Sequence, residues 1–79
     1  MTTVFMGSAG QDVSRVQDML NLLIQDGPPL RADGIFGPKT QARVVQFQKQ
    51  FGLFPDGIVG PLTGKSLVAA VFAAMNDVA

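Results

Sequence analysis

Apolar residues recur at intervals of three and four positions in three stretches of the chain, which is the spacing of one face of an α-helix. The first stretch has on that face Val13, Val16, Leu20, Leu23 and Ile24. The second has Val44, Phe47, Gln48 and Phe51, and the third has Leu67, Val68, Val71, Phe72 and Met75. The pattern therefore predicts an all-α fold, a compact three-helix bundle.

Residues that start or stop helices flank these three stretches. The second and third helices each begin with a glycine–proline pair, at Gly37 and Gly60. Proline is favourable as the first helical residue, because the N–H of that residue has no acceptor within the helix. Ser8 and Gln11 match a capping box, in which each side chain satisfies the other residue's backbone N–H. Gly27 suits the left-handed position after the first helix, and the two prolines behind it prevent continuation.

Two octapeptides separate the helices and repeat each other. Residues 33–40 read DGIFGPKT and residues 56–63 read DGIVGPLT, so six of eight positions agree at an offset of 23 residues. Asp before Gly is a common turn pairing, because the carboxylate accepts nearby backbone N–H groups and glycine adopts positive φ. We expect each threonine hydroxyl to bond backbone groups in the first turn of the following helix. The predicted turn residues are Asp33, Gly34, Gly37, Thr40, Asp56, Gly57, Gly60 and Thr63.

Several polar and aromatic side chains lie where the turns should meet the helices. Gln17 and Gln48 lie on or beside the apolar faces, and a buried amide must be paired, so we expect each to reach the backbone of a facing turn. Phe36 occupies the repeat position of Val59 and is expected in the core. For Phe54 burial and exposure both remain open. The Asp-Gly-Ile stretches also allow a small two-stranded contact between the repeats.

Composition excludes several classes of function. The 79 residues hold six Lys+Arg and six acidic residues, so the net charge is zero and no basic footprint for nucleic acid is present. No apolar run approaches the roughly 20 residues of a membrane span, and the first ten residues lack the pattern of a signal peptide. The chain has no Cys, His or Glu, so we expect no disulfide, metal site, cofactor or enzyme activity.

The two repeated aspartates invite two chemical interpretations besides a turn. Asp33 and Asp56 are a carboxylate pair of the kind used for acid–base chemistry, but no other residue type is present to complete a hydrolase site. Calcium loops need oxygen ligands at alternate positions, whereas Arg31 and Phe54 stand two residues before the aspartates. The structural interpretation is therefore favoured.

The motifs together resemble a known family. The sequence has Gly10, Val13, Val16-Gln17 and Leu20, the two DGxxGxxT turns, and Val44, Phe47-Gln48 and Gly52-Leu53 between them. This combination resembles the peptidoglycan-binding-domain-1 family over about residues 4–68. The resemblance implies a non-catalytic, three-helix module that holds cell-wall hydrolases of bacteria and phages on peptidoglycan. It implies a place at the cell envelope or in a phage.

The resemblance also suggests where a ligand would bind. Arginine and lysine form strong charge-assisted hydrogen bonds with carboxylates, such as those of peptidoglycan stem peptides. The candidate ligand-binding residues are Arg31, Phe54, Lys39, Arg43 and Lys65. The alternative for the cations is a scattered, solvated face. The chain lacks the Tyr and Trp that often contact sugars, which leaves open a second function, a protein-interaction module of a phage particle or a secretion apparatus.

The C-terminal segment continues beyond the family pattern. We interpret residues 1–79 as one domain in which residues 68–79 extend the third helix. Residues 68–75 carry no charged or polar side chain. We expect Val68, Val71, Phe72 and Met75 to pack on the bundle and the alanines between them to form the outer face. That face either tolerates solvent or docks onto a second copy or another protein, such as a cell-wall hydrolase.

Overall fold

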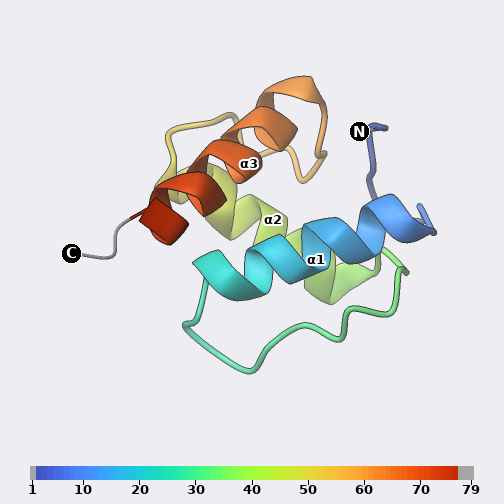
Figure 1. The fold of residues 1–79 in the computed structure, drawn as a ribbon. Helices are drawn as coiled ribbons and strands as arrows, with labels where there is room; N and C mark the ends of the chain where they lie inside the picture. Colours follow the sequence, from blue (N-terminus) through green and yellow to red (C-terminus); the bar gives the residue numbers. More distant parts are fainter. Residues whose placement is uncertain (1, 77–79) are drawn as a thin grey trace.

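The computed structural model describes residues 2–76, which form three helices joined by two loops (Figure 1). Helix α1 spans Gln11–Leu23, α2 spans Pro38–Gln50 and α3 spans Pro61–Asn76. Within the described range the backbone forms isolated β-bridges and no longer strand. The predicted all-α, three-helix fold is confirmed.

The core lies where the three helices meet and is completed by residues of the loops. The helices contribute Val13, Val16, Leu20, Val44, Phe47 and Leu67. The segments outside the helices contribute Val4, Ile24, Leu30, Phe36 and Val59. The expected burial of Phe36 is confirmed, because only 1% of its surface is exposed. Almost half of the buried apolar residues thus come from outside the helices, so the loops are an integral part of the fold.

The N-terminal segment ties the two repeated turns together. Val4 and Val59 exchange both backbone hydrogen bonds, at 3.1 and 2.9 Å. A few residues later Gly10 N–H donates to the Gly34 carbonyl (2.8 Å), and Ala9 pairs with Ile35. The two repeats were expected to pair with each other. Instead, each repeat forms a β-bridge with the segment that precedes α1.

Two expected boundaries of α1 are wrong. The N-cap is Gly10, with no side-chain cap, and the Ser8 hydroxyl instead accepts the Phe5 N–H at 3.0 Å. A capping box cannot form, because Gln11 is the first helical residue rather than the third. At the other end α1 stops at Leu23 and the chain becomes extended at once, so Gly27 lies beyond the cap and does not take positive φ.

Helix α2 ends in a Schellman motif. Gly52 has φ 71°, its N–H donates to the Lys49 carbonyl, and the Leu53 N–H donates to the Gln48 carbonyl at 2.8 Å. Phe51, expected on the buried face, is about half exposed at this helix end. Its ring stacks on Phe47 with centroids 4.3 Å apart, so it covers the core from outside.

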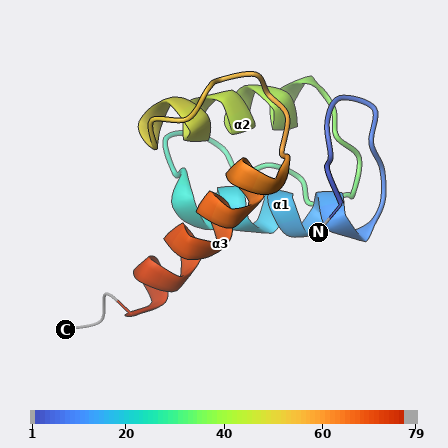
Figure 2. The ribbon, with the colours of Figure 1, turned by 90° about the horizontal axis from the view of Figure 1, so that it is seen from above.

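Helix α3 packs through a different face from the one expected. Its buried residues are Thr63, Gly64 and Leu67. Val68, Phe72 and Met75 are exposed, whereas Ala70 and Val71 are half-buried. Figure 2 shows the reason: only the first turns of α3 lie against the other helices, and the remainder projects away from them. Residues 77–79 of the predicted extension lie outside the described part of the chain.

The two turn glycines make different demands on the space around them. Gly34 has φ 77° and Gly57 has φ 75°, both in the left-handed region. A Cβ on Gly34 would lie 3.0 Å from the Gly10 carbonyl oxygen, a backbone atom that accepts the Ser14 N–H at the start of α1. A Cβ on Gly57 would lie 3.0 Å from Gln41 Cγ, part of a flexible side chain. The first turn is therefore the less tolerant.

We expect Gly34→Ala to lower the free energy of unfolding by more than about 1 kcal/mol, the usual cost of left-handed φ in a residue with a Cβ, with the clash added. Gly57→Ala keeps the φ penalty but allows the side chain of Gln41 to move. Urea unfolding of both variants measures the difference. Equal stability of Gly34→Ala and the wild type would show that this turn geometry is wrong.

Candidate functional site

One buried glutamine holds the first turn. Gln17, on α1, accepts the Gly34 N–H with its Oε1 at 3.0 Å. Its Nε2 donates to the Ile35 carbonyl and to Thr40 Oγ1, each at 3.0 Å, and more weakly to Asp33 Oδ1 at 3.4 Å. One side chain thus joins α1, the turn and the start of α2.

A second glutamine repeats this arrangement. Gln48, on α2, accepts the Gly57 N–H at 3.0 Å and donates to Asp56 Oδ1 (2.9 Å), the Ile58 carbonyl (3.1 Å) and Thr63 Oγ1 (3.1 Å). The expectation that each glutamine reaches a facing turn is confirmed. The expectation for the threonines is corrected, because each hydroxyl accepts from a glutamine side chain rather than bonding the first helical turn.

The two aspartates bond within their own turns. Asp33 accepts the Ile35 N–H at 3.0 Å, and Asp56 accepts the Ile58 N–H at 2.9 Å. This backbone bond is the main reason why the pKa of each carboxyl lies below its ordinary value of 3.8, and the glutamine amide lowers each pKa further. A carboxyl held in its charged form is an acceptor and a poor proton donor.

These lowered pKa values predict a loss of stability in acid. A carboxyl whose pKa is lower in the folded chain stabilises the fold above its unfolded pKa of about 4, and this contribution disappears as the pH falls through the folded pKa. We expect the free energy of unfolding, measured with urea, to fall as the pH drops below about 4. The Asp33→Asn, Asp56→Asn double variant should show a shallower fall. An unchanged slope in that variant would contradict these bonds.

A groove lies between the loop that follows α1 and the stretch of α2 from Pro38 to Gln46. It has a volume of about 920 Å³ and is open to solvent. The loop contributes Pro28, Pro29, Leu30, Arg31, Asp33, Ile35 and Gly37. Helix α2 contributes Pro38, Lys39, Thr40, Ala42, Arg43 and Gln46, and α1 contributes Gln17. We call this surface the α2 groove; the glutamine-held first turn forms part of its wall.

The α2 groove brings together three of the five candidate ligand-binding residues. Arg31, Lys39 and Arg43 line it, and Asp33 is its one acidic residue. The Arg43 guanidinium donates to the carbonyls of Ile24 (3.3 Å) and Pro28 (3.0 Å), so it fastens the loop to α2. Arg31 and Lys39 are exposed, and within residues 2–76 the only recorded ion pair involves neither of them.

The other two candidate residues lie elsewhere. Phe54 follows α2 and is 80% exposed, which settles the open question of its burial, and Lys65 is exposed on α3. Neither lines the α2 groove. The sequence pattern does not identify the apolar residues that line the groove. The main one is Ile35, which is 61% exposed although Gly34 and Phe36 on either side of it are buried. Adjacent Pro28 and Pro29 were the available signal, because two prolines give a stiff, exposed loop.

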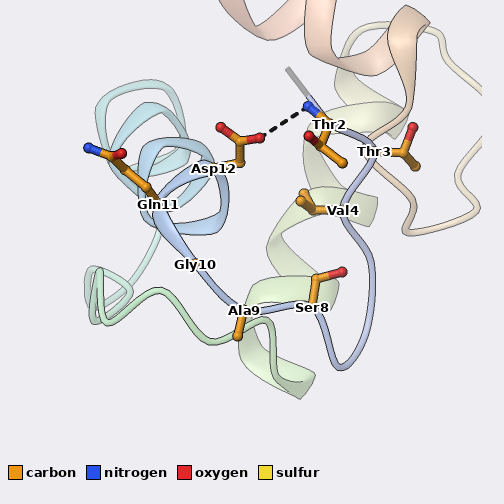
Figure 3. Close-up of a pocket in the computed structure, with 8 residues that line it drawn as sticks. All are labelled: Thr2, Thr3, Val4, Ser8, Ala9, Gly10, Gln11 and Asp12. Atoms are coloured by element: carbon orange, nitrogen blue, oxygen red, sulfur yellow. Dashed lines mark hydrogen bonds between the residues drawn. The ribbon is translucent and has the colours of Figure 1, made fainter.

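A smaller hollow of about 410 Å³ lies where the N-terminal segment meets α1 (Figure 3). The Thr2 N–H crosses it to donate to Asp12 Oδ2 at 3.1 Å, as the dashed line in Figure 3 shows. This bond is the main reason why the pKa of Asp12 is lowered. The one charged group lining the hollow is thus already bonded to the chain itself, and the α2 groove is the better candidate.

The side chains and helices of the described part of the chain, residues 2–76, can be compared with the requirements of a metal site and of a membrane span. No three His, Cys, Asp or Glu side chains gather there as a metal site would require. In the same range no helix combines the length and the apolar character needed to cross a bilayer.

Known proteins share this sequence pattern. An uncharacterized protein of Kitasatospora aureofaciens is 50% identical over 60 residues, which are 75% of this chain and 49% of that protein. The zinc D-Ala-D-Ala carboxypeptidase of Streptomyces albus G is 43% identical over 61 residues, which are 77% of this chain and 24% of the carboxypeptidase. The chain therefore spans half or less of these relatives.

The fold is also similar to that of solved structures. The SleB N-terminal domain superposes with a TM-score of 0.80 at 33% sequence identity, covering 87% of this chain and 92% of that domain. Residues 9–67 match the family described as "Putative peptidoglycan binding domain", and this range includes both repeated turns and the whole α2 groove. The chain belongs to that peptidoglycan-binding family.

Proposed function

We propose that this chain is a non-catalytic module that binds peptidoglycan in the α2 groove and so holds an attached or associated protein on the cell wall. Membership of the family supports the ligand. The observation that supports the site is the groove itself, an open surface with cations at its edge and apolar residues along its wall. Its backbone is held by Gln17 and Arg43, so the surface is formed before a ligand arrives.

The carboxyls of the two turns are poorly suited to general-acid catalysis. Asp33 and Asp56 each accept a backbone N–H and a glutamine N–H, and the pKa of each is lowered. A general acid needs a raised pKa near the working pH. Labelled sacculi incubated with the chain should therefore release no muropeptides, and release above a boiled-protein control would overturn the proposal that the module is non-catalytic.

Sedimentation with purified sacculi tests peptidoglycan binding. We expect the chain to pellet with sacculi at low salt and to remain in the supernatant with chitin, which offers a related glycan without stem peptides. Added salt should weaken the binding, because exposed charges are screened over about 10 Å at 0.1 M. A chain that stays in solution with sacculi at low salt would contradict the proposed function.

The distal part of α3 favours a second candidate function, association with another protein. Val68, Phe72 and Met75 form an exposed apolar stripe, and no charged residue occurs from Ser66 to Asn76. We propose self-association as the form to test, with Phe72→Gln as the variant. Light scattering over a range of concentrations should show dimers for the wild type and monomers for Phe72→Gln. Monomers for both at every concentration would contradict self-association.

A further inference from the structure

We infer that Arg31 and Lys39 make the α2 groove a receptor for the carboxylates of the peptide part of peptidoglycan, rather than for its glycan strand. This inference rests on the proposed function and names the part of the ligand that the groove recognises. It follows from which charged groups in the groove are already occupied, from a comparison of the two repeats and from the chemistry of the wall.

The charged groups of the groove divide into occupied and available ones. The Asp33 carboxylate is bonded by the Ile35 N–H, and the Arg43 guanidinium is bonded to two loop carbonyls. Arg31 and Lys39 are exposed on the loop and on the first turn of α2, and neither forms an ion pair within residues 2–76, although the charge of Arg31 is near enough to Asp33 to contribute to the lowered pKa of that carboxyl. The available charge is therefore positive, from two side chains at one groove.

The second repeat shows that folding of the turn does not require these cations. At the offset of 23 residues, Phe54 stands opposite Arg31, and Leu62 stands opposite Lys39. The hydrogen bonds of the frame are nevertheless the same, since Gln48 binds its turn and threonine as Gln17 does. The same set of hydrogen bonds therefore forms with apolar side chains at these two positions in one repeat and with cations in the other. We conclude that the cations are not needed to hold the turn and serve another purpose.

The wall between the cations matches a short acidic peptide. Pro28, Pro29, Pro38, Ala42 and the exposed Ile35 present aliphatic carbon. The chain has neither Tyr nor Trp, the flat polar aromatics that would stack on a pyranose ring. Methyl groups of alanine residues suit such a wall, and free carboxylates between them suit arginine and lysine, whose charge-assisted bonds with carboxylates are strong.

The test combines charge variants with modified ligand. One variant, Arg31→Gln with Lys39→Gln, removes both available cations of the groove. The matched control, Arg15→Gln with Lys49→Gln, removes the same charge from an exposed arginine and an exposed lysine outside the groove. The wild type and both variants are each titrated with native sacculi and with sacculi whose carboxyls have been converted to amides. Thermal unfolding of all three chains checks that they fold.

We expect the groove variant to bind native sacculi about tenfold more weakly than the wild type, the effect of two solvent-accessible ion pairs, and the control to bind like the wild type. The wild type should bind amidated sacculi about as weakly as the groove variant binds native sacculi. The affinity of the groove variant should be the same for native and for amidated sacculi. This second arm needs no mutation, so it decides the inference even if the groove variant fails to fold.

The outcomes separate this inference from the proposed function. Wild-type binding that is equally strong on native and amidated sacculi would overturn carboxylate recognition while leaving peptidoglycan binding intact. Equal weakening by the groove variant and by the control would show a general charge effect and would also overturn it. Absence of wild-type binding to native sacculi would overturn both proposals.

Discussion

Replacing Gln48 by methionine is expected to lower the free energy of unfolding by about 3–5 kcal/mol, although the two side chains have similar shape. The amide is fully buried and bonds the Gly57 N–H, the Ile58 carbonyl and the Thr63 hydroxyl. Methionine has neither the N–H donor for the carbonyl and the hydroxyl nor the oxygen acceptor for the Gly57 N–H, so these groups lose their partner, and each buried unsatisfied group costs about 1–3 kcal/mol. Urea unfolding followed by circular dichroism measures the loss.

The control for this prediction is Gln50→Met, two residues further along the same helix. Gln50 is exposed at the end of α2, so its replacement should change the free energy of unfolding by no more than about 0.5 kcal/mol. A Gln48→Met chain as stable as the Gln50→Met chain would show that the amide does not hold the second turn.

Phe47→Ala is the second change with a large expected effect, about 3–5 kcal/mol. The ring is completely buried, and Phe51 stacks on it from outside. Alanine would leave a cavity that a domain of this size cannot close without moving its helices. Because small domains are stable by only about 5–15 kcal/mol, this loss removes a large share of the stability, and the midpoint of thermal unfolding followed by circular dichroism should fall well below that of the wild type.

Phe54→Ala is the matched control for the core prediction. It removes the same ring from a position that is 80% exposed, and it should leave the midpoint of thermal unfolding close to that of the wild type. A cooperative Phe47→Ala chain with the same midpoint as Phe54→Ala would place Phe47 outside the core.

The sequence predicts the helices and the repeated turns well, because both depend on local chemistry. The glycine–proline starts at Gly37 and Gly60 and the positive φ of Gly34 and Gly57 follow from backbone sterics within a few residues. The buried amide of Gln17 could also be assigned, because a polar group on an apolar face needs a partner. Its threonine partner is 23 residues away in the chain, and no local signal identifies it.

The sequence does not predict features that depend on how the helices and loops pack against one another. Residues 61–76 hold more apolar positions than one face needs, and only the crossing of α3 over the other helices selects Leu67 for burial and leaves Phe72 exposed. The grouping of Arg31 with Lys39 likewise depends on how the loop returns to α2, and the bonds of Arg43 to the loop carbonyls set that path.

The central claim is that peptidoglycan binds in the α2 groove, and a titration of the ¹⁵N-labelled chain with a soluble muropeptide tests it most directly. We predict saturable amide shift changes that are largest in residues 28–43, the span that contains the loop, Arg31 and Lys39. Amides of residues 54–58 and of the distal part of α3 should change little and serve as internal controls. Saturable changes centred on those segments, or no changes at any muropeptide concentration, would contradict the claim.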